Sequence, residues 1–134
     1  MSHIVGARMV VRDLDAVEVA ADECGLTLMR GQKTMRCYQG QGACDHALKL
    51  KDARPGDYEI GLRTQEDGFG LVIDTWGPGR RLVEAAGPEM NTLRREYSAA
   101  VLTARARKKL APKGFTTTRE DLPGGRIRLR LRRR

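Results

Sequence analysis

The sequence predicts an α+β protein: an antiparallel sheet with two main helices packed on one face, in the order β-α-β-β-β-β-α-β-β. Short segments in which apolar and polar residues alternate recur along the chain, as is typical of half-buried strands. Two segments instead have apolar residues at the spacing of an amphipathic helix. The chain has 134 residues, enough to bury roughly two-thirds of its unfolded surface, and we expect one domain over residues 1–134.

The first elements are a strand, a helix and two more strands. Residues 3–12 form a short, largely apolar segment and predict the first strand. Asp13 is a suitable N-cap for a helix of about eleven residues, and Gly25 can end that helix in a left-handed conformation. We expect residues 26–29 to open a second strand, with residues 33–38 continuing it or pairing back onto it. Residues 39–42, which are glycine-rich, are expected to form a turn.

The middle of the chain predicts a meander. Residues 47–51 alternate as a strand, and Pro55-Gly56 lies in the following loop. Residues 58–63 and 69–76 flank Asp67-Gly68, a strong signal for a hairpin turn. A second helical region follows Gly79. We expect it to be interrupted near Gly87-Pro88, because a proline there removes an interior helix hydrogen bond.

The last third predicts a long helix and a closing hairpin. Residues 89–110 have apolar positions three or four apart, and Pro112 and Gly114 end the helix. Residues 115–120 and 126–132 are expected to pair across residues 122–125. The last strand alternates strictly, which predicts that Ile127, Leu129 and Leu131 face the core. The opposite face then carries a row of arginines, Arg126, Arg128, Arg130 and Arg132.

The basic residues are concentrated in this last third. The chain has a net charge of +8, and fourteen of its 25 Lys and Arg residues lie from Arg94 onward, where there are only three acids. Helix-end stabilisation and protection of a sheet edge explain four or five of these charges. The remaining positive charges predict an anionic partner that binds residues of the helix and the last strand. These are Arg94, Arg95, Arg105, Arg107, Lys108, Lys109, Arg126, Arg128, Arg130, Arg132, Arg133 and Arg134.

Two partners fit this surface, and both stay open. The leading interpretation is a small non-enzymatic protein that binds the backbone of RNA or DNA through forked arginine contacts. Aromatic residues are scarce in the basic third, which argues against the reading of single-stranded sequence there. The alternative is an adaptor or assembly subunit that docks the same face onto an acidic protein surface. Tyr38, Gln39 and Gln41 would add a second contact.

Several motifs along the chain resemble those of the conserved hypothetical chloroplast reading frame 35 family, which is a bacterial and plastid domain of unknown function. The resemblance covers nearly the whole chain, although Thr75 stands where family members often have a second Trp and the ending is more basic. It implies an accessory role beside an AAA-type ATPase, because the family's genes often lie near one for such an enzyme. The motifs are residues 1–3, 38–41, 58–61, 67–69, 75–77 and 119–127.

Other chemistry is weakly indicated. Cys37, Cys44 and His46 offer soft metal ligands, but their spacing matches no zinc motif, and we expect no metal and no cofactor. An activity based on Cys37 with His46 or His3 is the third option. The odd number of cysteines, three, and the absence of a leader or a long apolar run predict a reduced, cytoplasmic setting with no membrane.

Overall fold

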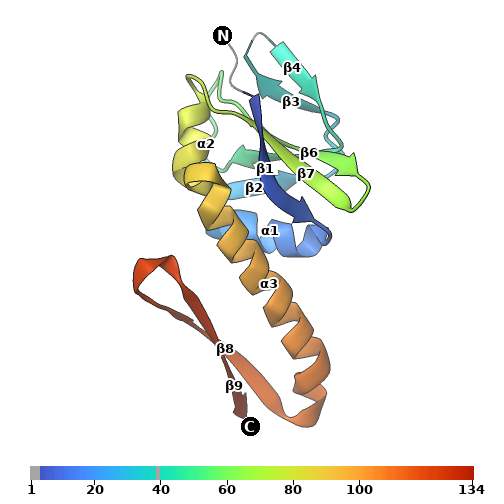
Figure 1. Cartoon of the computed structure of the whole chain (residues 1–134), viewed down its shortest axis with the longest axis vertical. Coiled ribbons are helices and arrows are strands. Elements are labelled where there is room, and N and C mark those ends of the chain that lie inside the picture. Colours follow the sequence, from blue (N-terminus) through green and yellow to red (C-terminus); the bar gives the residue numbers. More distant parts are fainter. Residues whose placement is uncertain (1–3, 39) are drawn as a thin grey trace.

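The computed structural model describes residues 4–38 and 40–134 and shows the predicted α+β fold (Figure 1). Its main element is a five-stranded antiparallel sheet with the order β1-β7-β6-β5-β2. The strands of this sheet are β1 (Ile4–Val11), β2 (Leu26–Met29), β5 (His46–Leu50), β6 (Ile60–Gln65) and β7 (Gly68–Asp74). The register Gln65↔Gly68 confirms the hairpin predicted at Asp67-Gly68.

Helices cover one face of the sheet and enclose the main core. They are α1 (Leu14–Glu23), α2 (Gly79–Ala86) and the long α3 (Asn91–Leu110). Val17, Leu82 and Leu93, one from each helix, are completely buried against sheet residues such as Leu62. Tyr97 of α3 joins this core, and its hydroxyl accepts hydrogen bonds from the backbone N–H groups of Arg12 (2.9 Å) and Asp13 (3.3 Å). The sheet and the helices thus form one packed body.

The local signals at the helix ends are confirmed. The Asp13 carboxylate accepts a hydrogen bond from the N–H of Ala16 at 3.1 Å, and Gly25 follows α1 with φ of 76°. The second helical region breaks between α2 and α3, where the short 3-10 turn Pro88–Met90 follows Gly87. Glu89 and Met90 both have positive φ there, so this break stores backbone strain.

A small hairpin covers the opposite face of the sheet. It consists of β3 (Thr34–Cys37) and β4 (Gly40–Ala43), paired as a separate two-stranded sheet. The prediction of a turn over residues 39–42 is therefore wrong for residues 40–42, because strand pairing with β3 overrides the turn preference of glycine; Gln39 lies outside the described residues. Met35 packs directly over Gly61, where an added Cβ would lie 2.4 Å from its sulfur.

The chain ends in an arm that projects from the rest of the molecule, the body (Figure 1). We define the arm as residues 101–134. It comprises the second half of α3, the turn Ala111–Lys113, and the hairpin of β8 (Phe115–Asp121) and β9 (Ile127–Arg133), which flank the turn Pro123–Gly125. The hairpin forms its own two-stranded sheet and contacts α3, so the expectation that it packs on the main core is wrong. None of residues 101–134 is fully buried. The alternating pattern predicted the strand correctly but did not identify its packing partner.

Candidate anion-binding surface

An ion-pair clamp joins the hairpin of the arm to α3. Arg119 of β8 donates two hydrogen bonds to the carboxylate of Glu96, at 2.6 and 2.7 Å, and a third at 2.9 Å to Asp121. The Glu96 side chain is only 12% exposed, so loss of Arg119 would leave a largely buried charge unpaired. These hydrogen bonds, first of all those to Glu96, raise the pKa of Arg119. The arm is therefore held to the body by a specific polar contact.

The outer face of β9 carries three of the four predicted arginines. Arg128, Arg130 and Arg132 alternate along the strand and are exposed, whereas Ile127 and Leu129 are half-buried against α3. Glu120 lies opposite in β8, with its Oε2 at 3.0 Å from Arg130 Nε and 3.5 Å from Arg128 Nη1. One carboxylate thus serves two of the three arginines, which leaves an excess of positive charge on this face. Leu131 is 48% exposed and does not reach a core.

Arg126 lies apart from that row, in a groove between α3 and the tip of the hairpin. The groove has a volume of about 650 Å³ and is lined by Arg94, Arg95 and Arg126, over an apolar floor that includes Leu129. The guanidinium of Arg95 lies over Gly125, where an added Cβ would be 2.7 Å from Cζ. Three arginines from two distant parts of the chain therefore converge on one groove, and no acid lines it.

The remaining predicted basic residues lie along the last turns of α3 and at the C-terminus. Lys108 and Lys109 are exposed in the last turn of α3, and Arg105 and Lys108 line a second groove against the body. The C-terminus returns to this end, because the N–H of Arg134 donates to the carbonyl of Gly114 at 2.7 Å. Arg133 lies over the ring of Phe115, at 5.4 Å from its centroid. The structure thus brings the end of α3 and the end of β9 together.

Most of these charges have no acidic partner. The three acids from Arg94 onward pair only with Arg119, Arg128 and Arg130. Within the parts of the chain that the structure describes, the other eleven bases of this third make no ion pair. They are Arg94, Arg95, Arg105, Arg107, Lys108, Lys109, Lys113, Arg126, Arg132, Arg133 and Arg134.

The second predicted contact lies at the opposite end of the molecule, on and beside the β3–β4 hairpin (Figure 1). Gln41 is exposed in β4, and Tyr38 is half-buried against Trp76, with ring centroids 5.1 Å apart and planes at 74°. Gln39 lies outside the described residues. The sequence analysis did not identify Trp76 as part of this contact, because Trp76 and Tyr38 are 38 residues apart in the sequence and no local pattern links them.

Cys37 and Cys44 are part of a buried apolar cluster. Cys37 and Cys44 are buried with Met35 and Ala47 between the small hairpin and the sheet, and burial raises the pKa of the Cys44 thiol. His46 accepts a hydrogen bond at Nδ1 from the N–H of Gly31 at 2.9 Å. Residues 4–38 and 40–134 contain no group of three or more His, Cys, Asp or Glu side chains placed to hold a metal ion. His3, named with Cys37 in the sequence analysis, lies outside the described residues.

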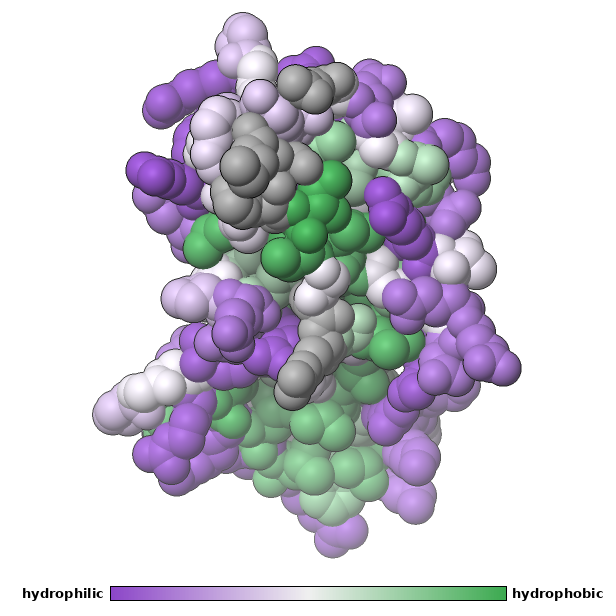
Figure 2. Space-filling view, turned by 45° about the horizontal axis from the view of Figure 1, so that its top comes forward, coloured by the Kyte–Doolittle hydropathy of each residue, from purple (hydrophilic) through white to green (hydrophobic). Residues whose placement is uncertain are grey.

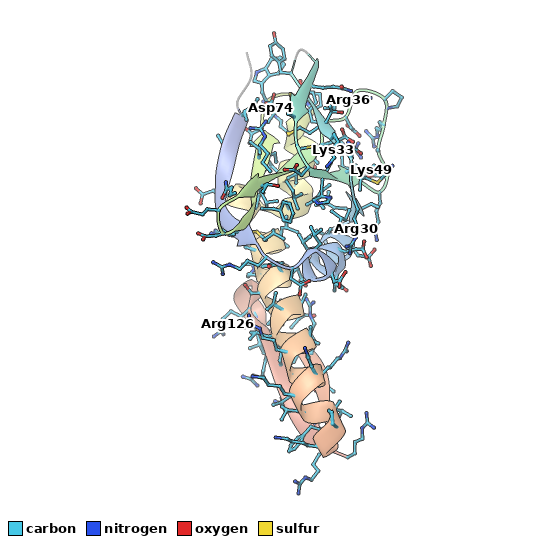
Figure 3. The ribbon with its side chains drawn as sticks, turned by 90° about the vertical axis from the view of Figure 1, so that its right-hand side faces the viewer. Arg30, Lys33, Arg36, Lys49, Asp74 and Arg126 are labelled. Carbon is cyan, nitrogen blue, oxygen red and sulfur yellow. The ribbon has the colours of Figure 1, made fainter. Side chains whose placement is uncertain are left out.

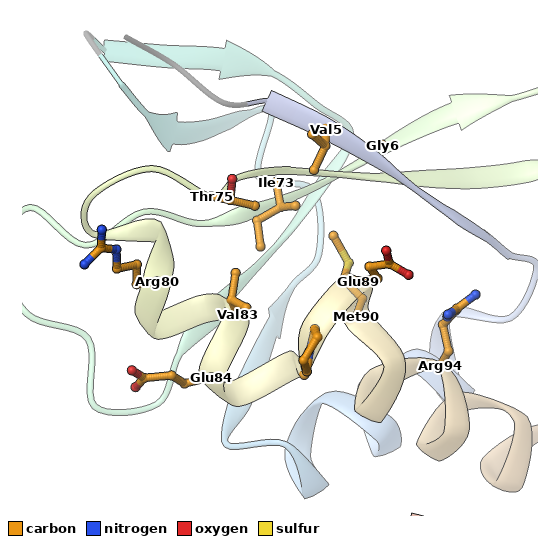
Figure 4. A pocket seen from close by; sticks show the side chains of 12 residues that line it. Val5, Gly6, Ile73, Thr75, Arg80, Val83, Glu84, Glu89, Met90 and Arg94 are labelled. Carbon is orange, nitrogen blue, oxygen red and sulfur yellow. The ribbon is translucent and has the colours of Figure 1, made fainter.

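A cavity of about 910 Å³ lies between β1 and the α2–α3 connection (Figure 4). Val5, Ile73, Val83 and Met90 give it apolar walls. The charged residues of its lining are Arg80, Glu84, Glu89 and Arg94. The strained Glu89 and Met90 lie on its border.

Comparisons of the chain with protein-family models, with curated proteins and with solved structures gave no match. The resemblance to the chloroplast reading frame 35 family therefore stays a prediction. Among the described residues, no helix has the length and apolar character needed to cross a membrane.

Proposed function

We propose that this protein binds the phosphate backbone of RNA or DNA through its arm, without reading base sequence and without catalysis, in a reduced, cytoplasmic setting. One observation carries the proposal: eleven Lys and Arg side chains that make no ion pair are concentrated on and beside an exposed arm. Like charges held this close repel one another, and a polyanion would offset that repulsion. Cations in the last turn of α3 also stabilise its C-terminus, but that role does not explain the arginines of β9.

The geometry of the arm suits backbone contacts. Successive outward residues of a strand are roughly 6.5–7 Å apart, close to the spacing of phosphates along a nucleic-acid strand. Arg128, Arg130 and Arg132 can therefore meet neighbouring phosphates, and guanidinium groups bind phosphate in a forked manner. The groove of Arg94, Arg95 and Arg126 offers a further seat for phosphate beside this row.

The salt dependence of binding tests this proposal. We expect affinity for a labelled RNA or DNA duplex to fall steeply and nearly linearly on a log–log plot against salt. In the double variant Arg128→Gln/Arg132→Gln the slope should decrease by about two, because each phosphate contact contributes roughly one. The matched control is Arg54→Gln/Arg80→Gln, which removes the same charge from exposed positions of the body. Equal slopes for the two double variants would contradict the proposal.

The alternative function is an adaptor that docks the arm onto an acidic protein surface, which the family resemblance suggests is an AAA-type ATPase. One observation favours it: Leu102 and Leu131 on the arm are 54% and 48% exposed. In Figure 2 hydrophobic surface extends over the lower part of the molecule, with hydrophilic residues on both sides. Purification of the tagged protein from its native cytoplasm, with and without nuclease, separates the two functions. A protein partner retained at fixed stoichiometry after nuclease treatment would support the adaptor.

A further inference from the structure

An aromatic pair is built into the surface at the end of the molecule opposite the arm. Trp76, which follows β7, is 43% exposed, and the Tyr38 ring meets it edge to face with centroids 5.1 Å apart. A large aromatic side chain left this exposed loses much of the hydrophobic stabilisation that burial would bring. The ring of Trp76 is thus available to a planar group from outside.

A buried carboxylate fixes the position of both aromatic residues. Asp74 is completely buried at the end of β7. Its Oδ2 accepts a hydrogen bond from the N–H of Tyr38 at 3.0 Å, and its Oδ1 accepts one from the N–H of Trp76 at 3.1 Å. A buried carboxylate is costly unless such hydrogen bonds compensate for lost hydration. Here those bonds hold two separate segments in register, so the aromatic pair is preorganised.

Basic and amide side chains flank the pair. Arg36 precedes Tyr38 by two residues, on the outward-facing side of β3, and lies directly across from Gln41 of β4. Figure 3 shows Lys33, Arg36 and Lys49 on the same side of the body, far from Arg126 of the arm along the long axis. None of these three residues makes an ion pair in the described part of the chain. Arg36 in β3 and Lys33 just before it therefore place two positive charges on the hairpin that carries Tyr38, and the Glu59 carboxylate accepts a hydrogen bond from the N–H of Arg36 at 2.8 Å.

We propose that Tyr38 and Trp76 form a stacking site for a base of single-stranded nucleic acid, with Arg36 and Lys33 contacting its backbone. This proposal rests on the proposed function and extends it, because it adds a contact with bases to the contact of the arm with phosphates. Aromatic rings beside basic side chains are the common arrangement for sequence-tolerant single-strand binding. An apolar or proline-rich peptide would use the rings but not the basic residues, so the charges favour nucleic acid.

Fluorescence of Trp76 tests the proposal directly, because it is the chain's only tryptophan. We would titrate the full-length protein with a labelled oligouridylate and, separately, with an abasic oligomer of the same length. Anisotropy of the label reports binding, and Trp76 emission reports stacking. We expect both oligomers to bind but only the oligouridylate to quench the emission. Binding of the oligouridylate without quenching would overturn the stacking site and leave the arm proposal intact.

Substitutions distinguish the stacking site from the arm. Trp76→Ala should lower affinity for the oligouridylate by about 5- to 100-fold and leave affinity for the abasic oligomer unchanged. Val19→Ala, at an exposed apolar position of α1 outside both proposed sites, serves as the control, with little change expected for either oligomer. An equal loss for both oligomers would overturn the proposal, as would quenching by a proline-rich peptide but not by the oligouridylate. If neither oligomer bound at low salt while the duplex did, the stacking site alone would be wrong; if the duplex also failed to bind, the proposed function would be wrong as well.

Discussion

The body and the arm are stabilised in different ways. The body, residues 4–100, has two buried apolar clusters on the two faces of one sheet. The arm has no fully buried residue and is attached through half-buried leucines and the Glu96–Arg119 clamp. The comparison teaches that the most charged part of the chain contributes least to the core. Its charges lie outside the two buried apolar clusters and are therefore accessible to a partner.

Removal of core leucines would sharpen this comparison most strongly. Leu62 is completely buried in the sheet, so Leu62→Ala should lower the free energy of unfolding by about 2–5 kcal/mol. Leu129→Ala removes the same atoms from a half-buried position on the arm and should cost about 1 kcal/mol or less. Urea denaturation followed by circular dichroism measures both. Equal losses would contradict the comparison, because Leu129 on the arm would then stabilise the protein as much as a fully buried leucine of the sheet.

The clamp should control the arm without affecting the body. Arg119→Ala leaves the largely buried Glu96 unpaired, and we expect the hairpin to open more easily by about 1–3 kcal/mol. Hydrogen exchange should therefore increase at amides of β8 and β9, while protection of β6 and β7 persists. Arg128→Ala is the control, because its ion pair with Glu120 is exposed and contributes at most about 1 kcal/mol. Faster exchange throughout the sheet would contradict this division.

Alkaline pH should weaken the contact between α1 and α3. Burial, together with Glu96 and Glu23, raises the pKa of Cys24 from 9.0 to about 11. The folded state therefore keeps this proton where the unfolded state loses it, and the stability that the neutral thiol contributes is lost as pH rises from about 9 to about 11. Since the thiol is partly exposed, we expect a change of at most about 1–2 kcal/mol.

Comparison with Cys24→Ser isolates this effect, because lysines and tyrosines also titrate in the same range. The difference in the free energy of unfolding between the two proteins should shrink as pH rises through that range. Urea titrations in reducing buffer at several pH values give this difference. A difference independent of pH would show that the thiolate is as well tolerated in the folded state as in the unfolded state.

Much of the fold could be predicted because its signals are local. Alternation, the Asp13 cap and the Gly87-Pro88 break act over a few residues, and the structure confirms each. The packing of β9 could not be predicted, because a half-buried face looks the same whether it meets a sheet or a single helix. Strand β4 was missed since its two glycines favour a turn until β3 pairs with them.

The candidate site shows the same limit. The sequence placed basic residues on the last helix and strand, and the structure gathers those around the end of the arm. The sequence did not indicate that Arg126 lies in the groove with Arg94 and Arg95 and not beside Arg128, because this position depends on the conformation of the Pro123–Gly125 turn. Nor could it reveal the Tyr38–Trp76 pair, which Asp74 holds together across the fold. Contacts between distant segments are the information that local patterns lack.

The turn of the arm offers the smallest and most local test. Gly125 has φ of 73°, and an added Cβ would lie 2.7–2.8 Å from the Arg95 guanidinium, whereas Gly124 has φ of 80° and nothing within 4 Å. Both Gly→Ala changes should therefore cost about 1 kcal/mol of backbone strain, but only Gly125→Ala should also displace Arg95. We expect Gly125→Ala alone to weaken duplex binding, measured by anisotropy at low salt. Equal weakening by both variants would mean that turn strain, and not the position of Arg95 in the groove, limits binding by the arm.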